Sequence, residues 1–156
     1  MQGQNATLVV IEFGASWPSW LNPSGSGNIA VVAQHYEGPA SSLVIQVASR
    51  LSRLVAVGWR IDDVVLVSNG RTDLESQAAR ALLARGLLLH LREVGGVRFV
   101  FTVAALLGRR ASHALHALTS ELEASALASG ISLCVRVGEG EPIYARPVPA
   151  RLSRAG

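Results

Sequence analysis

The chain contains no lysine, and all 14 of its basic side chains are arginine. This absence excludes the phosphate-binding lysine of a P-loop, the strand lysine of protein kinases and Schiff-base chemistry. Cys134 is the one cysteine. A single cysteine excludes a disulfide framework, a Cys-x-x-Cys redox pair and cysteine-based zinc or iron–sulfur sites within one chain. We therefore expect no cofactor, and catalysis is less favoured than binding.

Charged residues are also scarce, at 16% of the chain against 49% hydrophobic residues, and the net charge is only +3. At 156 residues we expect one domain, with part of its apolar surface covered by a second copy or by another protein. The arginines are scattered and aromatic residues make up 5%, which argues against a nucleic-acid partner. No apolar run is long enough to span a bilayer and no signal peptide is recognisable, so we expect a cytoplasmic protein without membrane attachment.

Hydrophobic periodicity predicts an α/β fold with five strands and three helices. The expected strands are 7–13, 28–36, 64–67, 97–103 and 131–137, and the expected helices are 41–57, 72–93 and 109–129. Strands separated by helices favour parallel pairs. We therefore predict a single three-layer α/β/α sandwich with a mostly parallel five-stranded sheet, in the order β-β-α-β-α-β-α-β. The first two strands lack a helix between them, so they pair either parallel or antiparallel.

This domain is expected to cover residues 1–138. Residues 139–156 contain three prolines and three arginines, and this composition predicts an extended C-terminal arm. The sequence leaves open whether the arm docks on its own domain or on another chain.

The helix expected at 72–93 has apolar residues on nearly every side. Leu83, Leu87 and Leu91 repeat at every fourth position and form a stripe separate from the core stripe. A helix of this kind is normally covered on more than one side. We therefore predict a non-catalytic interaction or regulatory domain that self-associates through these leucines, with a homodimer as the simplest closed assembly.

A second hypothesis places a ligand at the carboxyl ends of the strands, where open α/β sheets bind small molecules. Polar residues follow two of the strands: Asn69, Gly70 and Arg71 after the third, and Arg109, Arg110 and His113 after the fourth. Helix N-termini beside arginine favour phosphate or carboxylate groups. These six residues predict a binding domain, or an enzyme, for an anionic small molecule such as a nucleotide.

Several polar residues allow more than one interpretation. Thr72 and Glu75 have the spacing of a capping box at the start of the second helix. Glu12, with Glu37 and Asp73, could hold Mg²⁺ in a nuclease-like site, but a lone glutamate in a strand is also typical of a buried carboxylate with a partner. His113 and His116, three residues apart, have the spacing of metal ligands but also of a solvated helix face.

Overall fold

The computed structural model describes residues 4–12, 14–18, 20–21, 29–36, 40–106, 108–138 and 144–146. The elements along the chain are β1 (Gln4–Glu12), β2 (Ile29–Tyr36), α1 (Ala40–Ala56), β3 (Trp59–Ser68), α2 (Leu74–Glu93), β4 (Arg98–Val103), α3 (Gly108–Ser129), β5 (Ser132–Val137) and β6 (Tyr144–Arg146). The predicted order is confirmed up to β5. β6 adds a sixth strand from within the expected arm, most of which lies outside the described residues.

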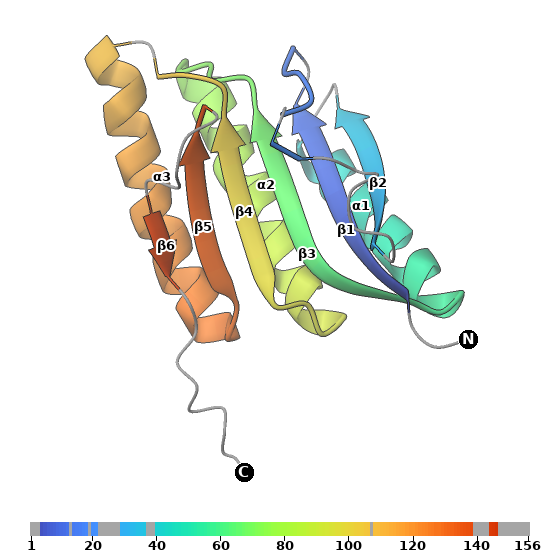
Figure 1. The fold of residues 1–156 in the computed structure, drawn as a ribbon. Helices are drawn as coiled ribbons and strands as arrows, with labels where there is room; N and C mark the ends of the chain where they lie inside the picture. Colours follow the sequence, from blue (N-terminus) through green and yellow to red (C-terminus); the bar gives the residue numbers. More distant parts are fainter. Residues whose placement is uncertain are drawn as a thin grey trace.

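One mostly parallel sheet forms the centre of the fold, with the strand order β2-β1-β3-β4-β5-β6. β1, β3, β4 and β5 run parallel to one another, and β6 pairs antiparallel with β5 at one edge. β2 pairs parallel with β1 at the other edge, which answers the question that the sequence left open. The sheet therefore has six strands rather than the predicted five (Figure 1).

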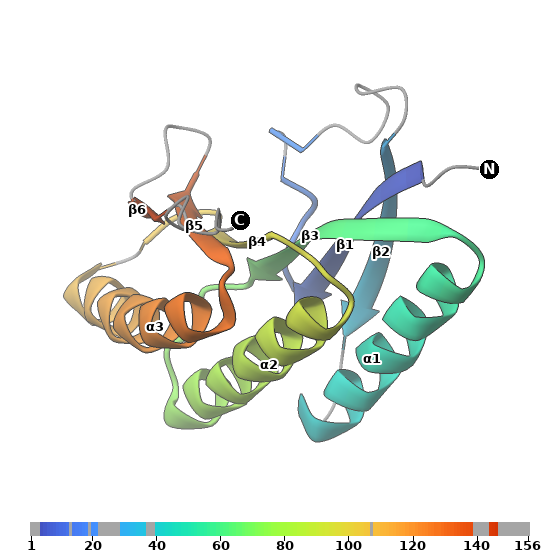
Figure 2. The ribbon, with the colours of Figure 1, turned by 90° about the horizontal axis from the view of Figure 1, so that it is seen from below.

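The three helices all cover the same face of the sheet, so the described elements form two layers rather than the predicted three (Figure 2). The handedness of the crossovers explains this arrangement. The connections from β2 to β3, from β3 to β4 and from β4 to β5 all advance in one direction across the sheet. Right-handed crossovers that advance in one direction place their helices on one face.

The main hydrophobic core lies between the sheet and these helices. It contains Leu8, Leu66 and Phe101 from the strands and packs them against α1, α2 and α3. Leu83, Leu87 and Leu91 belong to this core, and each is at most 1% exposed in the single chain. The prediction that these three leucines form an interface is therefore wrong, because they face the sheet of their own chain.

The opposite face of the sheet is also apolar. Val9, Ile11, Val65, Val67 and Val100 are buried there, and Ala15, Trp20, Leu21 and Cys134 pack against them. The segment that follows β1 thus covers part of the face that the helices leave free. Within the described part of the chain, no helix is long and apolar enough to cross a membrane.

Candidate functional site

The carboxyl ends of β1, β3 and β4 meet at one edge of the sheet. β1 lies between β2 and β3, although the chain passes from β1 to β2 before it reaches β3. The chain therefore reverses direction at β1, and such a switch point is where open parallel sheets bind ligands. The loop that follows β3, residues 69–73, lies beside this point.

A buried ion pair anchors this edge. Glu12, the last residue of β1, is 5% exposed, and Arg80 in the second turn of α2 is 8% exposed. Arg80 Nε donates to Glu12 Oε2 at 2.8 Å, and Arg80 Nη2 donates to Glu12 Oε1 at 3.0 Å. Two parallel N–H bonds to one carboxylate fix both side chains and offset the cost of burying two charges. Glu12 is therefore a partnered carboxylate, as one of the two interpretations of the sequence predicted.

The same ion pair holds the loop after β3. The backbone N–H of Asn69 donates to Glu12 Oε1 at 2.9 Å. The Asn69 side-chain oxygen accepts from Arg80 Nη2 at 3.1 Å and from the backbone N–H of Arg71 at 3.0 Å. Arg80 Nη1 also donates to the Arg71 carbonyl at 3.0 Å. The loop is thus fixed by side chains from two other elements rather than by its own turn alone.

Gly70 occupies the position in this loop that most needs a glycine. Its φ is +80°, in the left-handed region, and a Cβ built there would lie 3.4 Å from a methyl group of Val103. The Gly70 N–H donates to the Ser68 hydroxyl oxygen at 3.0 Å. A larger residue would strain the backbone and press on β4, so Gly70 brings the loop close to the end of that strand.

The start of α2 is occupied by carboxylates of the chain itself. Asp73 is the N-cap residue, and its carboxylate accepts from the Ser76 N–H at 3.0 Å. The predicted cap at Thr72 is therefore displaced by one residue. Hydrogen bonding by Ser76 lowers the pKa of Asp73. Arg71 lies 3.3 Å from Asp73, so its charge is directed partly to this cap.

A cavity of about 130 Å³ lies between α2 and α3, below the loop. Its polar lining comes mainly from the loop and the start of α2: Ser68, Arg71, Thr72, Gln77 and Arg80. Its walls are otherwise apolar or small: Ala81, Phe101, Val103, Ala105, Leu106, Ala111, Ala114, Leu115, Ala117 and Leu118. Gly70 lines the end of the cavity next to the loop, and Glu121 lines the cavity from the middle of α3. The cavity is thus polar where it meets the loop and mostly apolar elsewhere.

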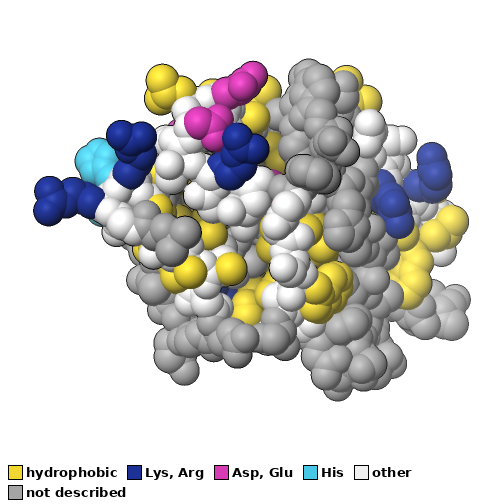
Figure 3. All heavy atoms as spheres, turned by 90° about the horizontal axis from the view of Figure 1, so that it is seen from above, with side chains coloured by type: hydrophobic (Ala, Val, Ile, Leu, Met, Phe, Trp, Pro, Cys, Tyr) yellow, Lys and Arg dark blue, Asp and Glu magenta, His cyan; other side chains and the backbone are white. Residues whose placement is uncertain are grey.

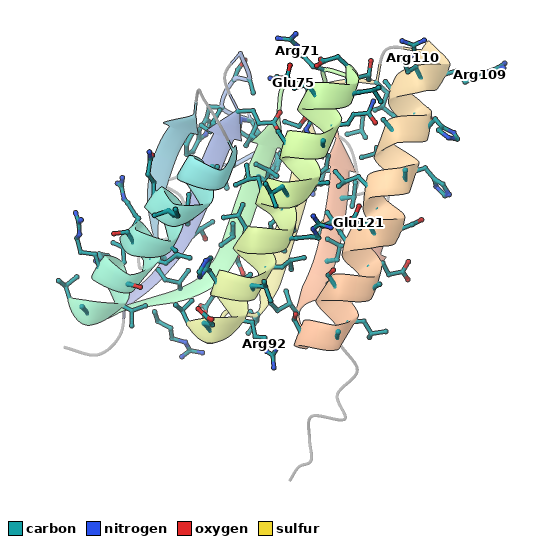
Figure 4. All side chains as sticks on the ribbon, turned by 180° about the vertical axis from the view of Figure 1, so that it is seen from behind. Arg71, Glu75, Arg92, Arg109, Arg110 and Glu121 are labelled. Carbon is teal, nitrogen blue, oxygen red and sulfur yellow. The ribbon has the colours of Figure 1, made fainter. Side chains whose placement is uncertain are left out.

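The structure brings together only part of the predicted ligand set. Gly70 and Arg71 line the cavity between α2 and α3, and Asn69 fixes the loop beside them. Arg109, Arg110 and His113 are exposed and do not line this cavity. Figure 4 shows Arg109 projecting outward from the end of α3, away from Arg71 above α2. On its cavity side α3 presents mainly apolar residues, with Glu121 as the charged exception.

A second cavity, of about 270 Å³, lies at the same edge on the other face of the sheet. Trp17, Pro18 and Trp20 line it together with Asn69 and Thr102. The Trp17 indole N–H donates to the Leu21 carbonyl at 2.6 Å, which fixes the ring.

Trp20, which lines the second cavity, also makes a cation–π contact that the sequence did not predict. The Arg136 guanidinium, on β5, lies 4.4 Å from the centre of the Trp20 ring. The two residues are far apart in sequence, so only the sheet order reveals that they meet. This contact ties the segment after β1 to the far side of the parallel sheet.

The candidate metal ligands do not converge. Glu12 is paired with Arg80, Asp73 caps α2, and Glu37 lies outside the described residues. His113 and His116 are exposed on α3. No group of three or more histidine, cysteine, aspartate or glutamate side chains in the described part of the chain could hold a metal ion.

Surface charge at this edge is mixed. Figure 3 looks down on the edge and shows positive, negative and apolar side chains next to one another. A mixed surface of this kind differs from the single-sign patch that nucleic-acid binding uses.

No protein-family model, curated protein or solved structure matches this chain at a significant level.

Proposed function

We propose that this chain is a binding domain for a small organic molecule, held in the cavity between α2 and α3 at the carboxyl ends of β3 and β4. The observation that carries the proposal is Arg80, a buried arginine that lines this largely apolar cavity. A few fixed polar groups in an apolar hollow are what small-molecule sites generally offer.

Arg80 retains one donor for a ligand. A guanidinium has five N–H groups. Four of them bind Glu12 twice, Asn69 once and the Arg71 carbonyl once, which leaves the second N–H of Nη1. Because the ion pair already fixes the side chain, a ligand that binds this N–H does not have to immobilise a flexible arginine.

The lining also supports binding rather than catalysis. It offers hydroxyl, amide and guanidinium groups, and its remaining surface is apolar. Such groups orient a ligand and exclude water from it. Among the described lining residues the one carboxylate, Glu121, is paired with Arg85 at 3.0 Å. A carrier or a ligand-sensing regulatory domain fits this lining better than an enzyme.

Thermal unfolding in the presence of a panel of small organic molecules and phosphorylated metabolites tests the proposal. We expect stabilisation by a compact member of the panel, and loss of that stabilisation in Ala114→Phe, which fills the cavity. The double variant Arg109→Ala/Arg110→Ala is the control, because these exposed arginines lie outside the lining, and it should respond like the wild type. Stabilisation that depends on Arg109 and Arg110 but not on Ala114 contradicts the proposal.

Self-association through an apolar helix face is a second candidate function, with different residues from those first predicted. Leu82 is 44% exposed and Leu89 is 55% exposed, and they lie seven residues apart on the outer side of α2. Such a pair can meet its own copy across a two-fold axis. We expect light scattering to show a dimer that Leu82→Glu/Leu89→Glu converts to a monomer, while Leu127→Glu, at an exposed position of α3, does not. A wild-type monomer at micromolar concentration would remove this candidate.

A further inference from the structure

Within the described part of the chain, every charged side chain that lines the cavity between α2 and α3 is paired. Arg80 is paired with Glu12 at 2.8 Å, Arg71 with Asp73 at 3.3 Å, and Glu121 with Arg85 at 3.0 Å. Each cation has a carboxylate, so the six side chains have a formal charge of zero. Among the described residues, a charged ligand therefore finds no lining side chain whose charge is not already paired.

This balance favours an uncharged ligand. An ion that enters a largely apolar site loses hydration, and only a free opposite charge repays that loss. Glu121 adds a direct penalty for anions, because it lines the cavity itself and lies on the side of α3 that faces α2 (Figure 4). The sequence-based expectation of an anionic ligand depended on Arg109 and Arg110, which lie elsewhere.

The size of the cavity limits the body of the ligand. Its volume of about 130 Å³ is close to the roughly 150 Å³ of an apolar protein cavity that accepts benzene. Drug-sized ligands need roughly 300 Å³ or more. A single ring or a short branched chain fills the space, and a nucleotide does not fit within it.

Small residues on two helices create this space. Ala81 on α2 faces a row of alanines on α3, Ala111, Ala114 and Ala117, at every third position. Larger side chains at these positions would close the gap between the helices. The alanines thus set the volume, while Phe101 and Leu115 supply the apolar wall.

Resting on the proposed function, we infer that the ligand is a compact uncharged molecule, one ring or about six carbon atoms in size, with one hydrogen-bond acceptor directed at Arg80 Nη1. The acceptor lies at the loop end, where Thr72 and Gln77 add polar surface, and the apolar body lies against α3. A carbonyl or amide oxygen meets this requirement.

Four probes test the ligand's charge and its hydrogen-bond acceptor separately, because they share one ring and differ in its substituent. They are benzamide, toluene, benzoate and benzylammonium. Binding is followed by amide chemical-shift changes at Gly70 and Ala114 on the folded full-length chain. We expect benzamide to bind, and benzoate and benzylammonium to bind at least roughly tenfold more weakly, because neither finds a free counter-ion. We also expect benzamide, but not toluene, to shift the Arg80 side-chain N–H signals.

Matched variants place the binding in the cavity. Ala114→Phe and the milder Ala117→Leu reduce the volume and should remove benzamide binding. Ala124→Phe, at an exposed position of the same helix outside the lining, should retain it.

Two results have different meanings. If benzoate binds as tightly as benzamide and shifts the same residues, the inference of an uncharged ligand is overturned and the proposed binding function stands. If no probe shifts these residues at millimolar concentration, and the wider panel gives no stabilisation either, the proposed function itself fails.

Discussion

Arg80 of α2 donates two hydrogen bonds to the carboxylate of Glu12 at the end of β1, although the two residues are 68 positions apart in the chain. The same guanidinium binds Asn69 and the carbonyl of Arg71. One side chain thereby connects the helical layer, the end of β1 and the loop beside the cavity.

Removal of one partner of this ion pair should be costly. Arg80→Ala leaves Glu12 as a buried charge without its counter-ion, and we expect a loss of about 3–5 kcal/mol in the free energy of unfolding. Urea denaturation, monitored by circular dichroism, measures this loss.

The double variant Glu12→Leu/Arg80→Met is the control, because it removes both charges and keeps apolar volume. We expect it to be clearly more stable than Arg80→Ala. If the two variants unfold at the same urea concentration, the charge left on Glu12 is not the cause of the loss.

The two leucine stripes of α2 should respond differently to truncation. Leu87 is fully buried against the sheet, so Leu87→Ala should cost about 2–5 kcal/mol. Leu89 is 55% exposed, so Leu89→Ala should change the stability of the monomer by no more than about 0.5 kcal/mol. Equal losses in chemical denaturation would show that the helix is rotated relative to its position in the structure.

Gly95 and Gly96, which follow α2, should reject alanine for different reasons. Gly95 has a φ of +82° and open space around it, so Gly95→Ala carries only a backbone cost of about 1–2 kcal/mol. A Cβ at Gly96 would lie 2.0 Å from Leu91 Cδ1, so Gly96→Ala overpacks the core at a cost of about 1–3 kcal/mol.

A double-mutant cycle distinguishes these two causes. In a Leu91→Ala background the cost of Gly96→Ala should fall, because the clashing methyl group is gone, and the cost of Gly95→Ala should stay the same. Independence of Gly96→Ala from Leu91 would count against the contact.

The thiol of Cys134 should make stability depend on alkaline pH. Burial raises the pKa of Cys134, although the charges of Arg136 and Arg98 counteract this in part. The unfolded chain therefore forms the thiolate at a lower pH than the folded chain does. The resulting stabilisation is complete below the pKa of the unfolded thiol and is lost as the pH rises through the pKa of the folded one.

Iodoacetamide alkylation as a function of pH measures this difference, because the thiolate is the reactive form. We expect the alkylation profile of the folded chain to lie at higher pH than the profile in urea. Cys134→Ser, which has no thiol to titrate, should lose the corresponding pH dependence of stability. Superimposable profiles for folded and unfolded chains would refute the predicted shift.

Local sequence patterns predicted the elements but not how they are layered. Hydrophobic spacing identified the three helices and the first five strands, since this signal is contained within each segment. The face that each helix covers depends on the order of the strands in the sheet. The hydrophobic pattern of a single segment does not contain that order. The three residues of β6 are too short to give a periodic signal.

The misassigned leucine stripe has a similar explanation. α2 packs on the sheet and also between α1 and α3, so it buries more of its circumference than an outer helix does. An apolar pattern nearly all round a helix shows that several sides are covered. It does not show whether the cover at Leu83, Leu87 and Leu91 is the same chain or another copy.

The site could be predicted only in outline. Asn69, Gly70 and Arg71 were identified because they follow a strand end, where ligands commonly bind. The pairing of Glu12 with Arg80 was missed because only the fold brings them together. The sequence did contain one indication of this pair. Glu12 lies in an apolar strand and Arg80 in a leucine-rich helix, and a charged side chain buried at either place requires a partner.

The place of β1 between β2 and β3 also has a consequence for the order of folding. The strand at the N-terminus pairs with β3 and receives the loop after β3 through a hydrogen bond that spans 57 residues. Closing such a long segment costs conformational entropy before the contact is made, so we expect contacts of this kind to form late. We expect Arg80→Ala to accelerate unfolding while leaving the refolding rate almost unchanged, since the Arg80–Glu12 bond would be absent from the transition state.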